Sequence, residues 1–122
     1  GYFDRNDYIF ENNVKMDYHP QETNEEGKKK KFTLKSEKLD MNSDTQSFTA
    51  ENNITIDYDQ KIIKGNKADY EGENEILTVT DEVYIREENG DWIRSNRAEF
   101  DLSTGEENFK ATGNVEIEIK LD

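Results

Sequence analysis

The side chains in this sequence that could support catalysis are a single histidine and many carboxylates. His19 stands before the only proline in a polar stretch, and no nucleophile or second metal ligand accompanies it. With 29 acidic residues among 122, close carboxylate pairs arise by chance, so no pair stands out as the acid and base of a hydrolase. We therefore expect no catalytic site and a protein that is not an enzyme.

One group of oxygen ligands has the spacing of a calcium loop. Asp40, Asn42, Asp44 and Glu51 occupy four of the ligand positions of an EF-hand. Thr45 stands where such a loop needs glycine for its sharp turn, and strand-like rather than helical sequence flanks it. Cysteine is absent, so thiolate ligands are absent too. We expect no metal site and no cofactor.

The charge balance bears on the class of partner. The net charge is −13, and 37% of the residues are charged. Such a chain is poorly suited to nucleic acid or to anionic membrane surfaces, which both require a basic face. The four lysines at 28–31 lie in a polar segment, 19–31, that we interpret as a surface loop. A solvated charge patch is the favoured reading of these lysines over an electrostatic guide for an anionic glycolipid.

A repeated phrase indicates how the chain is organised. The sequence ENNVKMDY at 11–18 returns as ENNITIDY at 51–58, with apolar and polar residues alternating in both copies. A period of two is typical of a half-buried β-strand.

The repeat extends over most of the chain with a period of about thirty residues. Six positions of the repeat, here called columns, are apolar in all three copies, and such self-similarity is typical of stacked repeats. The columns are Leu39, Met41, Phe48, Ala50, Ile54 and Ile56; then Ala68, Tyr70, Leu77, Val79, Val83 and Ile85; then Phe100, Leu102, Phe109, Ala111, Val115 and Ile117. A partial fourth copy at the N-terminus contains Tyr8, Phe10, Val14 and Met16.

Each unit predicts a strand, a polar turn, and a second strand that bends at ENN, or at TGN in the last copy, and then continues. The dipeptide at 89–90, Asn-Gly, predicts a two-residue hairpin turn that places Trp92 on the face of Ile85. No segment has helical periodicity. We predict one all-β domain over 1–122, of about a dozen short antiparallel strands, with a polar loop near 19–31.

The segment SNRAEFDLSTGEENFKATGNVEIEI resembles the OstA-like repeat of bacterial lipopolysaccharide-transport proteins. An alanine–aromatic strand, a turn and a GNV strand recur in that repeat. GNKADYEGENEILTVTDEVYI matches more loosely, with DEV in place of GNV, and SEKLDMNSDTQSFTAENNITI more loosely still. The resemblance covers about 33–122, with a fragment at 8–18.

The resemblance implies an antiparallel, V-shaped β-jellyroll that works in the periplasm. It implies binding of lipopolysaccharide through its acyl chains and assembly with other jellyrolls, edge to edge, into a bridge toward the outer membrane. Both the soluble bridge component and the membrane-anchored component of that system are similar to this chain, and a signal or an anchor is expected outside the given sequence. The alternative is a non-transporting extracellular β-repeat scaffold or glycan-binding module.

The apolar columns are the candidate lipid-contacting residues, although filling a protein core is the commoner role of such columns. We expect them to point inward together. The groove candidates are Ile54, Ile56, Leu77, Val79, Val83, Ile85, Phe100, Leu102, Phe109, Val115 and Ile117.

The two ends of the repeat are expected to be sheet edges that pair with other jellyrolls or head to tail with a second copy. The competing interpretation is that charged residues near the C-terminus protect that edge. The edge candidates are Tyr8, Phe10, Val14 and Met16 at one end and Ile117, Ile119 and Leu121 at the other.

Overall fold

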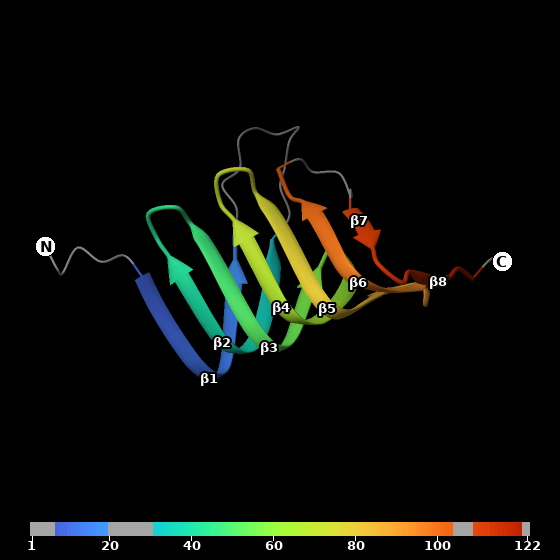
Figure 1. Ribbon diagram of the computed structural model, residues 1–122, viewed down its shortest axis with the longest axis horizontal. Coiled ribbons are helices and arrows are strands. Elements are labelled where there is room, and N and C mark those ends of the chain that lie inside the picture. The colour runs from blue at the N-terminus through green and yellow to red at the C-terminus, as the bar shows by residue number, and fades with distance from the viewer. Residues whose placement is uncertain (1–6, 20–30, 104–108, 121–122) are drawn as a thin grey trace, which may run out of the picture.

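The computed structural model describes residues 7–19, 31–103 and 109–120. These residues form one antiparallel sheet and no helix, so the predicted all-β class is confirmed. The strands follow one another in sequence order from β1 to β7, and β8 pairs with β6 beyond the end of β7 (Figure 1). They are β1 (Asp7–Tyr18), β2 (Phe32–Asn42), β3 (Ser47–Tyr58), β4 (Lys61–Glu71), β5 (Ile76–Glu87), β6 (Trp92–Asp101), β7 (Phe109–Thr112) and β8 (Glu116–Glu118).

A pair of residues in the left-handed conformation interrupts each of β1, β3 and β5 near its middle. In β3 these residues are Asn52 and Asn53, with φ of 70° and 54°, and together they oppose the single residue Asn66 of β4. The same register shift occurs at Asn12–Asn13 in β1 and at Asp81–Glu82 in β5. An extra residue on one strand bends it, and asparagine tolerates positive φ better than most residues do.

The repeated ENN is therefore the bend of the strand, as predicted. The expected dozen short strands is wrong, because each long strand runs through its bend without ending. In the last copy, Gly113 and Asn114 hold the left-handed positions and separate β7 from β8.

The bends align across the sheet and divide it into two halves, which fold toward each other (Figure 1). Half-sheet 1 comprises residues 7–11, 38–42, 47–51, 67–71, 76–80, 97–101 and 109–112. Half-sheet 2 comprises residues 14–18, 32–36, 54–58, 61–65, 83–87, 92–95 and 116–118.

The inner corner of the bend contains small residues on the even-numbered strands. Ile54 pairs with Gly65, and Val83 pairs with Ser95. The Ser95 hydroxyl, which is buried, donates a 3.0 Å hydrogen bond to the carbonyl oxygen of Arg97. A Cβ atom at Gly65 would lie 2.5 Å from Cγ1 of Val79 and 3.3 Å from the carbonyl oxygen of Thr80. The two halves approach so closely here that a larger residue has no room.

The turn between β5 and β6 corrects one prediction. The Glu87 amide donates a 2.8 Å hydrogen bond to the carbonyl oxygen of Asp91, so the loop has three residues, and Gly90 adopts a φ of 101°. Trp92 consequently pairs with Arg86 and lies on the outer face, not on the face of Ile85. One additional loop residue is enough to invert the facing of the next strand.

We predict that Gly65→Val lowers the free energy of unfolding by about 1–3 kcal/mol, because the added atoms overpack the corner of the bend. Urea denaturation measures the change. Asn66→Val is the matched control, since Asn66 is exposed on the same strand. Equal midpoints for Gly65→Val and the unmodified protein would contradict the crowding argument.

Candidate functional site

The inner faces of the two half-sheets carry the apolar residues in continuous rows. Within a row each residue pairs directly with the next across neighbouring strands, so the row members share one face. The row of half-sheet 2 is Met16, Leu34, Ile56, Ile63, Ile85, Ile93 and Ile117. The rows of half-sheet 1 are Tyr8, Met41, Phe48, Tyr70, Leu77, Phe100 and Phe109, and Phe10, Leu39, Ala50, Ala68, Val79, Ala98 and Ala111.

Between the halves, protein side chains fill the centre of the fold. Ala50, Ala68 and Ala98 are fully buried, and their small size leaves room for the branched side chains of the facing half. Eight of the eleven groove candidates belong to this packed core. They are Ile54, Ile56, Leu77, Val79, Val83, Ile85, Phe100 and Leu102.

An aromatic cluster connects the two halves near the β1 end. Tyr18 of half-sheet 2 and Tyr70 of half-sheet 1 have ring centroids 5.0 Å apart, and their hydroxyl oxygens form a hydrogen bond of 2.9 Å. Phe32 packs beside both, with its centroid 5.0 Å from Tyr18 and 6.2 Å from Tyr70. The contacts of Tyr70 with Tyr18 and Phe32 join β4 to β1 and β2, which are not its neighbours in the sheet, so they hold the folded halves together.

Burial raises the pKa of the Tyr70 hydroxyl far above its usual range. The hydrogen bond with Tyr18 and the nearby Tyr18 and Glu75 charges act in the same direction. The phenol therefore stays neutral in the folded protein at pH values where an exposed tyrosine ionises.

The apolar rows are uncovered at both ends of the sheet. Tyr8 and Phe10 on β1 are 47% and 45% exposed, and Val115 and Ile117 at the other end are 42% and 57% exposed. Ile117 pairs with Ile93 and so lies on the inner face, but neither it nor Val115 is covered by the opposite half-sheet. The reason is that, among the described residues, the short strands β7 and β8 form an edge of the sheet.

The remaining candidates at the ends differ in exposure. Phe109 is half-buried and stacks on Phe100, with centroids 5.2 Å apart. Val14 and Met16 are also half-buried, and Ile119 is exposed. Leu121 lies outside the described residues.

Several inner-face residues were missed at the sequence level. Leu34, Ile63 and Ile93 occupy corresponding places on β2, β4 and β6, and the first two are fully buried. Their spacings of 29 and 30 residues match the repeat, so extending each unit toward its N-terminus would have found them.

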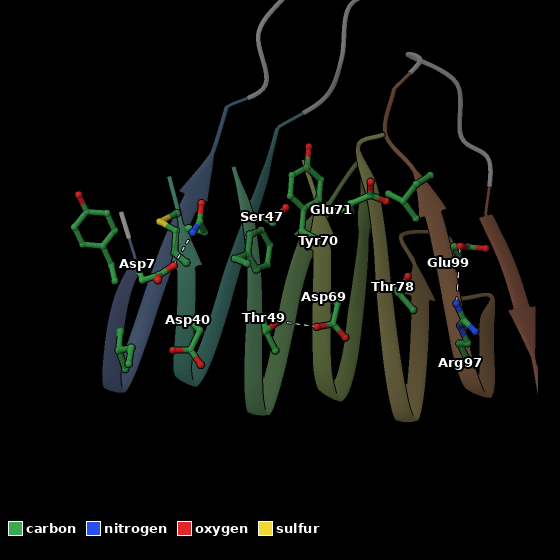
Figure 2. Close-up of a pocket in the computed structure, with 16 residues that line it drawn as sticks. Asp7, Asp40, Ser47, Thr49, Asp69, Tyr70, Glu71, Thr78, Arg97 and Glu99 are labelled. Carbon is green, nitrogen blue, oxygen red and sulfur yellow. Dashed lines mark hydrogen bonds and ion pairs between the residues drawn. The ribbon is translucent and has the colours of Figure 1, made fainter. Parts of the chain in front are cut away.

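A hollow along half-sheet 1 is lined by outer-face residues together with inner-face Tyr8, Met41, Phe48 and Tyr70. It has a volume of about 770 Å³, and carboxylates of alternate strands line it, namely those of Asp40, Asp69 and Glu99 (Figure 2). Thr49 donates a 2.7 Å hydrogen bond to Asp69, and Arg97 lies 3.9 Å from Glu99. Asp69 and Glu99 thus have partners within the protein.

The structure also bears on the metal site, the histidine and the lysine run considered from the sequence. Within 7–19, 31–103 and 109–120, no group of three or more His, Asp or Glu side chains is arranged to hold a metal ion. Asn42 of the calcium-like spacing instead accepts a 2.9 Å hydrogen bond from the Thr45 amide in a turn. His19 and Lys31 are exposed, and residues 28–30 lie outside the described part of the chain.

The same described ranges contain no helix with the length and apolar character needed to cross a membrane. Comparison of the chain with protein-family models, with curated proteins and with solved structures finds no match.

We predict that stability falls as the pH rises above about 10. The unfolded tyrosine ionises near that value while Tyr70 in the folded protein stays protonated, so ionisation favours unfolding. Below the unfolded pKa the Tyr70 contribution is constant. We expect Tyr70→Phe to remove this part of the pH dependence. Urea denaturation of both proteins between about pH 8 and 11 tests this, through the change with pH in the difference between their free energies of unfolding. Parallel curves for the two proteins would contradict the assignment.

Proposed function

We propose that this protein binds lipopolysaccharide through its acyl chains and carries it through the periplasm, as a jellyroll component of a transport bridge. The supporting observation is the continuity of the inner face. Its apolar rows extend across the whole sheet and stay uncovered at both edges, through Tyr8 and Phe10 on one side and Val115 and Ile117 on the other. The similarity of the repeat units to the OstA-like repeat supports the same proposal.

The physical basis is apolar transfer. An acyl chain gains roughly 0.8 kcal/mol for each buried CH₂, so several chains need no specific polar anchor. At the C-terminal edge, Val115 and Ile117 present such a surface without rearrangement. Entry deeper into the fold requires the half-sheets to separate, because Ile85 and Phe100 are buried against other side chains.

The two edges support the bridge part of the proposal. Within the described residues, β1 pairs only with β2, and β7 and β8 pair only with β6. Each edge therefore leaves backbone groups available to a further strand. A strand of another jellyroll added there would extend the apolar rows from one molecule to the next.

We predict that a photocrosslinking residue at Ile117 captures lipopolysaccharide and that the same residue at Glu116 does not. The two positions are adjacent and exposed but lie on opposite faces of β8. Mass spectrometry of the crosslinked species identifies the lipid. A probe at the buried Ile85 is expected to crosslink only if the half-sheets separate around the ligand.

Equal capture at Ile117 and Glu116 would count against an acyl-binding inner face. Absence of lipid at all three positions, with the fold retained, would favour the alternative of a β-repeat scaffold that transports nothing. The filled core is the observation that favours that alternative.

We also predict end-to-end association that increases with protein concentration and with salt. Salt acts because it screens the repulsion between copies of net charge −13. Proline at Ile117, or deletion of 114–122, is expected to abolish the association, since either change removes the pairing capacity of the C-terminal edge. Sedimentation velocity measures it, and a protein that stays monomeric at high concentration in raised salt would refute the prediction.

A further inference from the structure

The outer face of half-sheet 2 carries a line of cations at right angles to the strands. Cross-strand pairing places Lys15 beside Lys35 and continues through Thr55, Lys64 and Tyr84 to Arg94. The four basic side chains are all exposed. We call this line the cation row, and it consists of Lys15, Lys35, Lys64 and Arg94.

Within the described residues the cation row forms no ion pair, and its one direct acidic neighbour along the line is Glu116, the cross-strand partner of Arg94 on β8. No carboxylate oxygen of the described residues lies within 4.0 Å of the charged nitrogens of these four side chains, whereas on half-sheet 1 Lys67 lies 4.0 Å from Asp69. Lys15 and Lys35 are direct cross-strand neighbours, an arrangement of like charges that lowers stability. In a protein of net charge −13, three lysines of this line therefore stand exposed without an ion pair to stabilise the sheet.

Groups suited to sugar hydroxyls and sugar faces lie beside the cation row. Asn66 and Asn96 are exposed at the bend, and their side-chain amides make no hydrogen bond within the described part of the chain. Neither has a positive φ, so the backbone does not explain the choice of asparagine at these two positions. An amide offers both donors and acceptors, as hydroxyl-rich ligands require.

Aromatic rings occupy one end of the cation row. The Arg94 guanidinium lies 5.6 Å from the ring centroid of Tyr84 and 5.3 Å from that of Trp92. Trp92 is held in place by a hydrogen bond from its Nε1 to Glu118. The arginine is thus fixed over two rings with its outer side available to an anion.

The carboxylates on either side of the cation row favour a partner that is no wider than a single polymer chain. Lys35, Lys64 and Arg94 are on alternate strands, so their spacing is about 9.5 Å. The carboxylates of Asp17 and Asp57 border the row on one side, two residues along the strands, and Glu37 and Glu82 lie at the bend on the other. A broad anionic surface such as a membrane or a nucleic-acid duplex would meet these four carboxylates as well, whereas a single chain that lies along the row from Lys15 to Arg94 and stops short of Glu116 would not.

We propose that the cation row, with the amides of Asn66 and Asn96, binds a single strand of an anionic polysaccharide whose acidic groups recur along the chain. The cations would pair with its carboxylates, and the amides with its hydroxyls. The site is on the outside of the fold and does not depend on acyl-chain binding to the inner face.

The test uses a galacturonate oligosaccharide as the probe, titrated into the full chain at low salt and followed by NMR chemical shifts. Binding is expected, with shifts confined to half-sheet 2 and an affinity that falls as salt is added. Lys35→Gln together with Lys64→Gln is expected to weaken it about ten-fold or more, since two charge-assisted contacts are lost.

Lys38→Gln together with Lys67→Gln is the matched control. It makes the same chemical change on the same two strands, β2 and β4, but on half-sheet 1. The control is expected to change the affinity less than about two-fold, because only long-range charge is altered.

Four outcomes would overturn the proposal. They are no binding of the oligosaccharide, equal loss in the two double variants, equal binding of a neutral dextran oligomer, and tighter binding of the row to vesicles of anionic phospholipid. No lipid is present in the oligosaccharide titrations, so their failure leaves the acyl-chain proposal unaffected, and a failure of lipid capture leaves this proposal unaffected.

Discussion

The fold depends on the backbone pairs with positive φ that interrupt β1, β3 and β5 and that separate β7 from β8. A left-handed conformation costs most residues about 1 kcal/mol or more, so four such pairs in line are a substantial local cost. The gain is that a sheet with only one apolar face can bury that face against itself, with no second layer. Asparagine lowers the cost at Asn52 and Asn53, and glycine lowers it at Gly113.

The period-two pattern and the thirty-residue repeat were sufficient to predict strands, their shared inner face and the bends. They did not predict the facing of Trp92, because loop length depends on turn geometry that a dipeptide does not determine. They also did not predict how far the halves close. The filled core reflects matched side-chain volumes in three dimensions, as at Gly65 and Val79, whereas the exposure of Ile117 reflects where the sheet ends.

The packed interior determines how much free energy a ligand can gain by binding between the half-sheets. An acyl chain entering there replaces contacts that Ile85 and Phe100 already make with protein atoms, so the net gain is a difference between two apolar environments. The exposed side chains at the edges are different, because Val115 and Ile117 exchange water for lipid. On the proposed function, transfer would therefore begin at an edge.

The strict sequential order of the strands has a consequence for how the chain folds. Every strand from β2 to β6 pairs with the strands just before and after it in the sequence, and the β3–β4 hairpin is closed by only Asp59 and Gln60. Most loop closures on the route to the native sheet are therefore short, which favours fast folding for a β-protein. The sheet can grow from any hairpin toward both ends, one strand at a time. The Tyr18–Tyr70 contact spans 52 residues, so it forms only after several strands are in place.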